Sequence, residues 1–284
     1  MSASSRPAPD GRDIASHYSR GDLLERLDAA LAADGVDPSH PTIEALAPYD
    51  QFHGRGMEAT AALADWMPAR ASDRILDIGS GIGGPARYVA TRFGCRVNGI
   101  DLTPEFCAVA RDLTTRLGLS DRVTFDVANA LALPFADATF DGVYSMNVSM
   151  NIADKAAFHR EIARVLKPGG WVVLAEIAKG TGGELEFPTP WASSAATSFL
   201  ATEDETRRSL VDAGFDLVEM RNTREAAVAY GARARAMVER GEKPPHRSVQ
   251  LVHGDAAKAA MANSSKAQAD GRLVPIEILA RKRR

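Results

Sequence analysis

The chain has 284 residues, of which 45% are hydrophobic and 25% are charged, and its formal net charge at pH 7 is −3. A chain of this size and composition can bury a full core, and we expect one globular domain with an added subdomain. The near-neutral charge excludes an electrostatic basis for nucleic-acid binding, and no window approaches the roughly eighteen apolar residues of a membrane span. We therefore expect neither nucleic acid nor a membrane as a partner.

The first residues, MSASSRPAPDGRD, are polar and lack the apolar segment of a secretory signal, so we expect a cytoplasmic protein. Cys95 and Cys107 are too few for a disulfide framework and lie in apolar patterns, which is typical of buried small hydrophobic side chains. No Cys or His cluster has metal-ligand spacing, so no metal site is predicted. The sequence gives no indication of the oligomeric state.

The N-terminal part of the chain predicts a helical lid over residues 13–70, preceded by a disordered tail at 1–12 that is rich in Ser, Pro and Gly. Apolar residues recur at near-helical intervals from Asp13 to Ala33, and Gly35 is a plausible stop. The segment through Pro38, Pro41 and Pro48 is expected to be a loop. A second helical pattern runs from Met57 to Met67.

The stretch from Ile75 to Ala90, ILDIGSGIGGPARYVA, predicts a strand, a tight turn and a helix. Its three alternating glycines, Gly79, Gly81 and Gly83, tolerate positive φ and let a ligand approach the backbone closely. The following helix presents unpaired N–H groups and its positive dipole end at the same place. The turn therefore predicts a site for a polar, partly anionic ligand.

Two cofactor classes fit this turn. Gly79, Gly81 and Gly84 also have the GxGxxG spacing that holds a pyrophosphate in dinucleotide-binding proteins. Asp77 favours the other class, because a carboxylate beside the glycines suits a cationic amino group or a hydroxyl better than a pyrophosphate. Asp101, twenty residues after Gly81 at the end of the next strand (95–100), is placed to accept hydrogen bonds from a ribose of either cofactor.

Strands and helices then alternate regularly along the chain. This alternation predicts a mostly parallel sheet with helices on both faces, and it places ligands at the carboxyl ends of the strands. Asp77, Asp101, Asn129 and Asn147 all fall at such ends. The predicted elements are a helix at 104–117, a strand at 123–127, a strand at 141–146, a helix capped by Asp154 and ending at Leu166, and a strand at 171–177.

The C-terminal part combines the remaining core elements with two irregular additions. Residues 179–201, which contain Trp191, predict a long loop that is equally compatible with a substrate lid and with a plain surface excursion. A helix at 203–213 and strands at 215–221 and 273–280 complete the core, which spans 71–222 and 272–284. Between these strands, residues 223–271 form an insertion with helical patterns at 226–240 and 249–269, and we expect it to build a cap over the substrate site.

The segments ANALALPF, FDGVYSM and LKPGG, together with the glycine turn, resemble the class I S-adenosylmethionine-dependent methyltransferases. The resemblance implies a doubly wound, seven-stranded Rossmann-like α/β sheet with its last two strands antiparallel, and S-adenosylmethionine as the cofactor. It implies that Asp77, Gly79, Gly81 and Gly83 flank the methionine part. It also implies that Asp101 takes the ribose hydroxyls. The adenine end would lie against Leu102, Asn129 and Ala130, and Met146 would be a further cofactor-binding residue. Asn129 departs from the Asp of many members, although its amide oxygen can still accept a hydrogen bond.

The N-terminal region and the segment SMNVSMNIADK are similar to a subgroup related to sarcosine and dimethylglycine N-methyltransferases and, more distantly, to tocopherol methyltransferases. By that likeness Tyr18, Gln51 and His53 lie near the transferred methyl group. His53 is the candidate base or substrate anchor, because imidazole titrates near neutral pH. Tyr18 and Asn147 would orient the substrate or the cofactor carboxylate.

We accordingly expect a small-molecule methyltransferase that acts by in-line displacement, with an amine as the leading acceptor. Arg20, Arg55 and Arg87 are candidates to pair with an acceptor carboxylate, with surface solvation as the default for each. The alternative is C- or O-methylation of a larger apolar acceptor, which is favoured if the cap and Trp191 line a wide hydrophobic pocket. A more remote alternative is a dinucleotide-dependent oxidoreductase.

Overall fold

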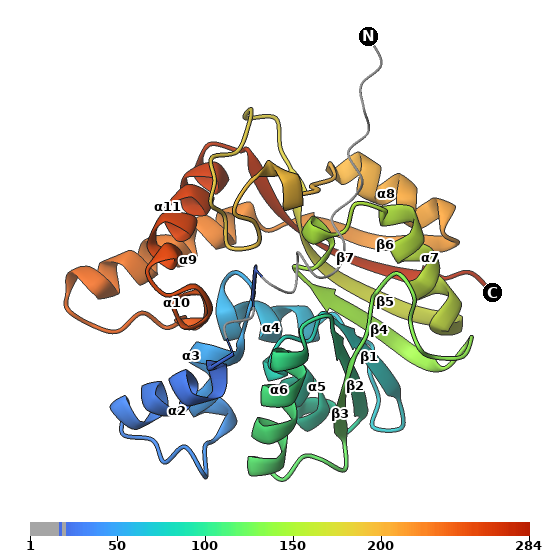
Figure 1. Cartoon of the computed structure of the whole chain (residues 1–284). Helices are drawn as coiled ribbons and strands as arrows, with labels where there is room; N and C mark the ends of the chain where they lie inside the picture. The colour runs from blue at the N-terminus through green and yellow to red at the C-terminus, as the bar shows by residue number, and fades with distance from the viewer. Residues whose placement is uncertain (1–16, 19–20) are drawn as a thin grey trace.

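The computed structural model describes residues 17–18 and 21–284. The predicted tail at 1–12, the start of the first predicted helix and Arg20 lie outside the described residues. Seven strands form one sheet in the order β3-β2-β1-β4-β5-β7-β6 (Figure 1). Among the described helices, none combines the length and apolarity that crossing a membrane requires.

The sheet confirms the predicted fold class. Strands β1 to β5 are parallel to one another, and β7 runs antiparallel between β5 and β6. The strands are β1 (Arg74–Ile78), β2 (Arg96–Asp101), β3 (Val123–Val127), β4 (Phe140–Met146), β5 (Leu166–Lys179), β6 (Phe215–Asn222) and β7 (Leu273–Lys282). Because the five parallel strands share a direction, their carboxyl ends meet along one edge of the sheet.

The helices begin and end where the sequence carries terminal signals. Asp154 caps α7 by accepting from Ala157 N, and Pro104 is the first residue of α6. Thr202 and Glu205 form a capping box at the start of α8. The helices are α2 (Leu23–Ala33), α3 (Ile43–Asp50), α4 (Gly56–Ala64), α5 (Gly84–Phe93), α6 (Pro104–Arg116), α7 (Lys155–Val165), α8 (Glu203–Asp212), α9 (Arg224–Glu239), α10 (Ser248–His253) and α11 (Ala256–Ala269), with short 3₁₀ turns at Ser149–Asn151 and Ala195–Thr197.

Three local predictions were wrong. The proline-containing segment is not a loop throughout, because Thr42 accepts from Ala45 N and starts α3, whose last turn accommodates Pro48. Strand β5 begins at Leu166, which pairs with Phe140, and it includes residues 167–170, which the sequence placed outside the predicted strand at 171–177. The second helical pattern of the insertion is two helices, because Gly254 between them adopts φ 56° and ψ −130°, a conformation that ends α10.

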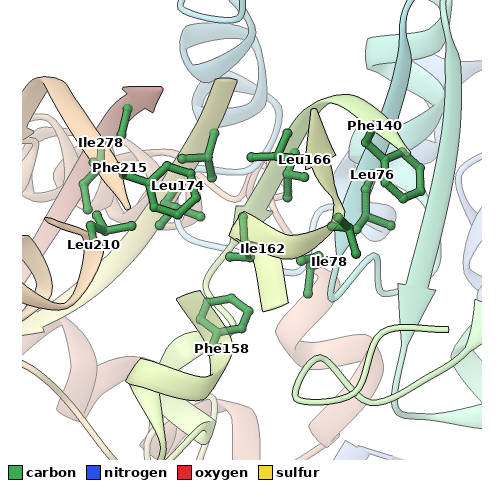
Figure 2. Packing of buried hydrophobic residues seen from close by; sticks show 14 of the residues in the cluster. Leu76, Ile78, Phe140, Phe158, Ile162, Leu166, Leu174, Leu210, Phe215 and Ile278 are labelled. Atoms are coloured by element: carbon green, nitrogen blue, oxygen red, sulfur yellow. The ribbon is translucent and has the colours of Figure 1, made fainter. Parts of the chain in front are cut away.

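A hydrophobic core lies between the sheet and helices α7 and α8 (Figure 2). Phe158 and Ile162 of α7 and Leu210 of α8 point toward sheet residues such as Leu174 and are fully buried. Each such side chain contributes roughly 2 kcal/mol to the free energy of unfolding through removal of apolar surface from water. This core fixes the sheet and thereby the relative positions of the strand ends.

The insertion folds back toward the N-terminal helices. Figure 1 shows α9, α10 and α11 together on the side of the sheet opposite α7 and α8. Leu251 and Val252 of α10 belong to one apolar cluster with Leu23 and Leu27 of α2, and Arg247 N donates to Pro48 O (2.7 Å). These contacts join two segments about two hundred residues apart in the sequence, and they enclose the space above the strand ends.

Candidate active site

Two cavities adjoin at the carboxyl ends of the parallel strands. One, of about 280 Å³, contains the glycine turn, and we refer to it as the strand-end cleft. The other, of about 170 Å³, lies under the insertion, and we refer to it as the cap cavity. Five residues line both cavities: Tyr18, Phe52, His53, Met146 and Asn147. A group held in one cavity can therefore meet a group held in the other at these residues.

The glycine turn after β1 forms one wall of the strand-end cleft. Gly79 N and Ser80 N both donate to Ile100 O, at 2.8 and 2.9 Å, which folds the turn against the end of β2. Gly79 has φ +75°, and a Cβ on it would lie 2.1 Å from Val148 Cγ2. Gly83 (φ +86°) caps α5 and has no room for a Cβ beside Phe125. Gly79 and Gly81 line the cleft, whereas Gly83 only shapes the turn.

Asp101 links the turn to the end of β2. Its Oδ2 accepts from Gly81 N (2.9 Å) and its Oδ1 accepts from Thr103 N (2.8 Å). Each carboxylate oxygen has a second lone pair, which leaves the group able to accept from ligand hydroxyls in the cleft. Burial raises the pKa of Asp101, and the backbone donors oppose that rise.

Asp77, at the end of β1, is an incompletely satisfied polar group of the cleft. It is 2% exposed, and its Oδ2 has no hydrogen bond within normal geometry among the described residues. Burial raises its pKa to about 7, the nearby Tyr144 hydroxyl opposes that rise, and Asp101 adds to it. A buried carboxylate with an unpaired oxygen is costly, so the cleft is suited to a cationic or hydrogen-donating ligand group at this point.

The remaining predicted cleft residues surround its far end. Leu102, Asn129 and Ala130 all line the cleft, and Asn129 Oδ1 accepts from Leu131 N (2.9 Å) within its own turn. Phe106 and Thr103, which sequence reasoning missed, also line it. Phe106 stacks edge-on against Phe52 with a centroid distance of 5.1 Å. Both residues follow closely after Asp101 at the end of β2, and this position in the sequence could have identified them as lining residues.

The boundary between the cavities is held by Tyr18, Asn147 and Asn151. Tyr18 Oη donates to Asn151 Oδ1 (3.1 Å), and Asn151 Nδ2 donates to Trp191 O (2.9 Å). Asn151 thus ties the N-terminal segment to the loop at 179–201, a role not foreseen from the sequence. Asn147 has φ +56°, which asparagine tolerates better than most residues, and its N–H donates to Ala175 O (2.7 Å). Burial raises the pKa of Tyr18, which keeps its hydroxyl protonated.

His53 also lies on this boundary, but it belongs to a buried polar network. Its Nδ1 lies 3.2 Å from Gly54 O and its Nε2 lies 3.0 Å from Thr60 Oγ1. Burial lowers the pKa of His53 to about 3, so the ring is neutral at physiological pH. A neutral ring with both nitrogens engaged is poorly suited to accept a proton from a ligand, contrary to its expected role as a base.

Gln51 lies behind His53 and lines neither cavity. It is fully buried, accepts from Thr60 Oγ1 (2.6 Å) and donates to Asp50 Oδ1 (2.7 Å). Asp50 in turn pairs with the buried Arg87 of α5 (3.0 Å). Gln51 and Arg87 therefore support the position of His53 and α5, and the structure does not bring them to a ligand surface.

The cap cavity is lined mainly by apolar side chains, including the predicted Trp191. Trp191 is 5% exposed and its Nε1 donates to Ser198 Oγ (2.9 Å). Besides the shared Tyr18, Phe52 and Met146, the other large apolar and aromatic residues around the cavity are Met150, Ile177, Pro190, Tyr230, Val249, Val252, Met261, Pro275 and Ile276. They come from β5, β7, the loop at 179–201, the insertion and the 3₁₀ turn after β4, and this set was not identifiable from any one sequence motif.

Charged groups are few in the cap cavity. Arg55 is the one lysine or arginine among its described lining residues, and its guanidinium pairs with Glu277 (2.7 Å). Arg221 pairs with the other oxygen of Glu277 (2.6 Å). Glu176 is the second carboxylate in the lining: its Oε2 accepts from Ser149 Oγ (2.6 Å), and its Oε1 has no partner among the described residues.

A family model described as "Methyltransferase domain" matches residues 76–174. Methyltransferase GfsG of Streptomyces halstedii is 31% identical over 221 residues, which cover 75% of this chain and 76% of that protein. Two shorter matches are each 39% identical. The tocopherol O-methyltransferase of Arabidopsis thaliana covers 40% of this chain and 33% of that protein, and the norajmaline N-methyltransferase of Rauvolfia serpentina covers 39% and 38%.

Solved structures show the same fold at lower identity. The [4+2]-cyclase SpnF superposes with a TM-score of 0.70 at 24% identity and covers 99% of both chains. A putative sarcosine dimethylglycine methyltransferase from Galdieria sulphuraria superposes with a TM-score of 0.61 at 18% identity, covering 94% of this chain and 92% of that one. These likenesses concern the fold alone, so the predicted sarcosine/dimethylglycine subgroup stays a hypothesis.

Proposed function

The chain belongs to the class I S-adenosylmethionine-dependent methyltransferases, and we propose that its acceptor is an apolar small molecule larger than sarcosine or dimethylglycine. The coarser activity, transfer of a methyl group from S-adenosylmethionine to a small molecule, follows from family membership. The size and polarity of the acceptor go beyond what family membership implies. The observation that carries it is the apolar cap cavity adjoining the strand-end cleft.

The strand-end cleft fits the cofactor. Asp77, with its unpartnered buried oxygen, would accept from the cofactor's cationic amino group, and Asp101 would accept from the ribose hydroxyls. Leu102, Phe106, Asn129 and Ala130 would surround the adenine, and Met146 would lie at the reacting end. When bound, the cofactor supplies an activated methyl group on a sulfonium. The contribution of the protein is then to orient the acceptor and to exclude water.

The cap cavity supports a larger acceptor. Its volume of about 170 Å³ far exceeds the roughly 15 Å³ that one water needs, so it has room for a molecule of many non-hydrogen atoms. Trp191 and the aliphatic side chains from β7 and the insertion favour apolar contacts. From the sequence, a larger apolar acceptor is favoured if the cap and Trp191 line a wide hydrophobic pocket. Residues of the cap and Trp191 both line this cavity.

The charge pattern of the cavity argues against a small amino acid. A sarcosine or dimethylglycine carboxylate needs a cation, and Arg55 already pairs with Glu277 across buried atoms. A second carboxylate in this desolvated site would have to compete with Glu277 for the Arg55 guanidinium, which weakens its binding. The acceptors in the names of two relatives, tocopherol and norajmaline, support this proposal.

The test is transfer of labelled methyl from S-adenosylmethionine to a panel of acceptors at equal concentration. The panel contains glycine, sarcosine and dimethylglycine as small amines, 2-naphthol as a wide phenol, 2-naphthylamine as a wide amine, and prenylated phenols. We expect transfer to the wide acceptors at least about tenfold faster than to the small amines. Faster transfer to sarcosine or dimethylglycine would overturn the proposal and restore the leading amine hypothesis.

A further inference from the structure

Among the described residues that line the cap cavity, Glu176 is the one carboxylate with an oxygen that lacks a hydrogen bond. The side chain is 4% exposed, and Oε1 has no hydrogen-bond partner among the described residues. Glu277, the other carboxylate of the lining, has each oxygen paired with an arginine. A buried, unsatisfied acceptor costs about 1 to 3 kcal/mol or more, so a ligand donor in the cavity would be favoured at Glu176.

The position of Glu176 places it next to the boundary between the cavities. It follows Ala175 in β5, and Ala175 O accepts from the N–H of Asn147, which lines both cavities. The parallel register also aligns Met146 with Ala175. Glu176 therefore lies next in sequence to a residue that contacts the boundary, and it lines the cavity in which an acceptor would be held.

The carboxylate is held in place from behind. Ser149 donates to Oε2 through both its hydroxyl (2.6 Å) and its N–H (3.3 Å). Lys155 donates to the carbonyl of Ser149 and to Ile152 O and Phe199 O (both 2.6 Å). Oε2 is thus fixed by the turn after β4, and Oε1 is the oxygen of this cavity-lining residue that has no hydrogen bond among the described residues.

We propose that Glu176 is the general base of the reaction and that the methyl acceptor is a hydroxyl group, which makes this enzyme an O-methyltransferase. This inference rests on the proposed wide apolar acceptor. The acceptor O–H bond breaks and its proton moves to Glu176 Oε1, while the oxygen forms the new bond to the methyl carbon. The sulfur of the methyl donor keeps the electron pair of the broken S–C bond and becomes a neutral thioether. The proton later leaves Glu176 to solvent.

A hydroxyl requires such a base, whereas a neutral amine does not. The alternative base, His53, has both ring nitrogens engaged by Thr60 and Gly54. Burial also raises the pKa of Glu176 above its usual range, against the opposing effects of the Ser149 hydrogen bonds and the nearby Lys155 charge, which strengthens it as a proton acceptor near neutral pH. The other titratable groups at this cavity are Tyr18, His53, Tyr230, His246, His253 and the paired Arg55 and Glu277, and Lys155 lies behind Ser149.

The experiment compares Glu176→Gln with the wild type in single-turnover methyl transfer to two matched probes, 2-naphthol and 2-naphthylamine, between pH 5.5 and 9. We expect the substitution to slow transfer to 2-naphthol by about 10² to 10⁴-fold and to remove its dependence on pH. Transfer to 2-naphthylamine should change less than about tenfold. Equal losses with both probes, or a 2-naphthol rate within about threefold of wild type, would overturn the role of Glu176 as a base.

Glu277→Gln is the matched control, because it neutralises a second carboxylate of the same cavity whose oxygens are both paired. We expect it to lower the thermal midpoint while the pH profile with 2-naphthol keeps its wild-type shape. Binding of S-adenosylhomocysteine, measured by calorimetry, should be unchanged in Glu176→Gln. Loss of that binding would show a structural role and would count against the proposal.

A second readout separates this inference from the proposed function. If the wild type methylates neither naphthyl probe, the wide-acceptor proposal fails, and the state of Glu176 is read by infrared spectroscopy of the S-adenosylhomocysteine complex. We expect a protonated-carboxyl band that titrates above the usual glutamate range and disappears in Glu176→Gln. A band with a normal midpoint near 4, or none attributable to Glu176, would overturn the inference independently.

Discussion

The strand-end cleft and the cap cavity lie side by side, yet they are built in different ways. The cleft is made from short motifs that each follow a parallel strand, and Asp77, Gly79 and Asp101 belong to two consecutive strand ends. The cap cavity draws on the N-terminal segment, β5, the loop at 179–201 and the insertion. The residues of the cofactor site therefore come from short local motifs, whereas the residues that would select the acceptor come together only when distant segments pack.

The two cavities also differ in how their polar groups are satisfied. The cleft leaves Asp77 Oδ2 unpartnered where a ligand cation would bind, whereas the cap cavity pairs its arginine with Glu277 and leaves one oxygen of Glu176 unpaired. The first arrangement favours a cationic ligand group, and the second favours a ligand without a carboxylate that donates a hydrogen bond. Substitutions that act on one cavity and spare the other test this comparison directly.

The largest effect is expected from Gly79→Ala. Its Cβ would overlap Val148, and its φ of +75° would cost an L-residue about 1 to 2 kcal/mol. We expect S-adenosylhomocysteine affinity, measured by calorimetry, to fall at least about 100-fold. Gly118→Ala is the matched control, because Gly118 has φ +66° with open space around it and lies outside both cavities. Equal affinity losses in the two variants would contradict a specific role for Gly79.

A pH-dependent effect is expected from Asp77. Its pKa is raised from 3.8 to about 7, so the folded state without ligand holds the proton more tightly than the unfolded chain. Its contribution to stability therefore decreases as pH rises from about 4 to about 7. A cationic amino group needs the ionised carboxylate, so S-adenosylhomocysteine affinity should rise with pH up to about 7, by at most about tenfold per pH unit.

Asp77→Asn should abolish that dependence, weaken S-adenosylhomocysteine at pH 8 by more than about tenfold, and raise the thermal midpoint of the free protein at pH 8. Calorimetry at pH 6 in buffers of different ionisation enthalpy should detect proton release in the wild type only. Asp126→Asn, an exposed carboxylate on β3, serves as the control. An unchanged pH dependence in Asp77→Asn would remove the ammonium-binding role.

Trp191→Ala should act on the cap cavity alone. Loss of its ring removes apolar contact area from the acceptor site, and we expect the KM for 2-naphthol to rise about tenfold while S-adenosylhomocysteine affinity stays within about twofold. Trp66→Ala is the control, because Trp66 stacks under Arg221 at 3.6 Å and lines neither cavity. A larger change in S-adenosylhomocysteine affinity than in the KM for 2-naphthol would show that the two cavities do not act separately.

The smallest effect is expected from Tyr18→Phe. It keeps the ring that lines both cavities and removes the hydrogen bond to Asn151, which is worth about 1 kcal/mol. We expect the KM for 2-naphthol to rise about fivefold, together with a small loss of cofactor affinity. Tyr88→Phe is the control, because the Tyr88 hydroxyl accepts from Arg92 Nη1 (3.1 Å) away from both cavities. This variant should change neither quantity. A Tyr18→Phe enzyme identical to wild type would exclude a role for this bond in closing the site.

The fold was predictable because its signals are local and repeated. Each strand of the parallel sheet is a short apolar run, and caps such as Asp154 and stops such as Gly118 mark the helices between them. The failures came where tertiary pairing overrode local chemistry. Leu166 entered β5 because Phe140 offered a partner strand, and Pro48 remained helical at the end of a capped helix.

The fold class and the strand-end residues could be predicted from the sequence, because parallel strands bring their carboxyl ends to one edge of the sheet. The cofactor could be predicted through the family resemblance. The tertiary structure decided the rest. Whether Arg55 is free or paired, whether His53 can titrate, and whether Glu176 keeps an open oxygen all depend on side chains contributed by segments far apart in the chain. Hydrogen bonding and desolvation are properties of that three-dimensional neighbourhood, so no single stretch of sequence specifies them.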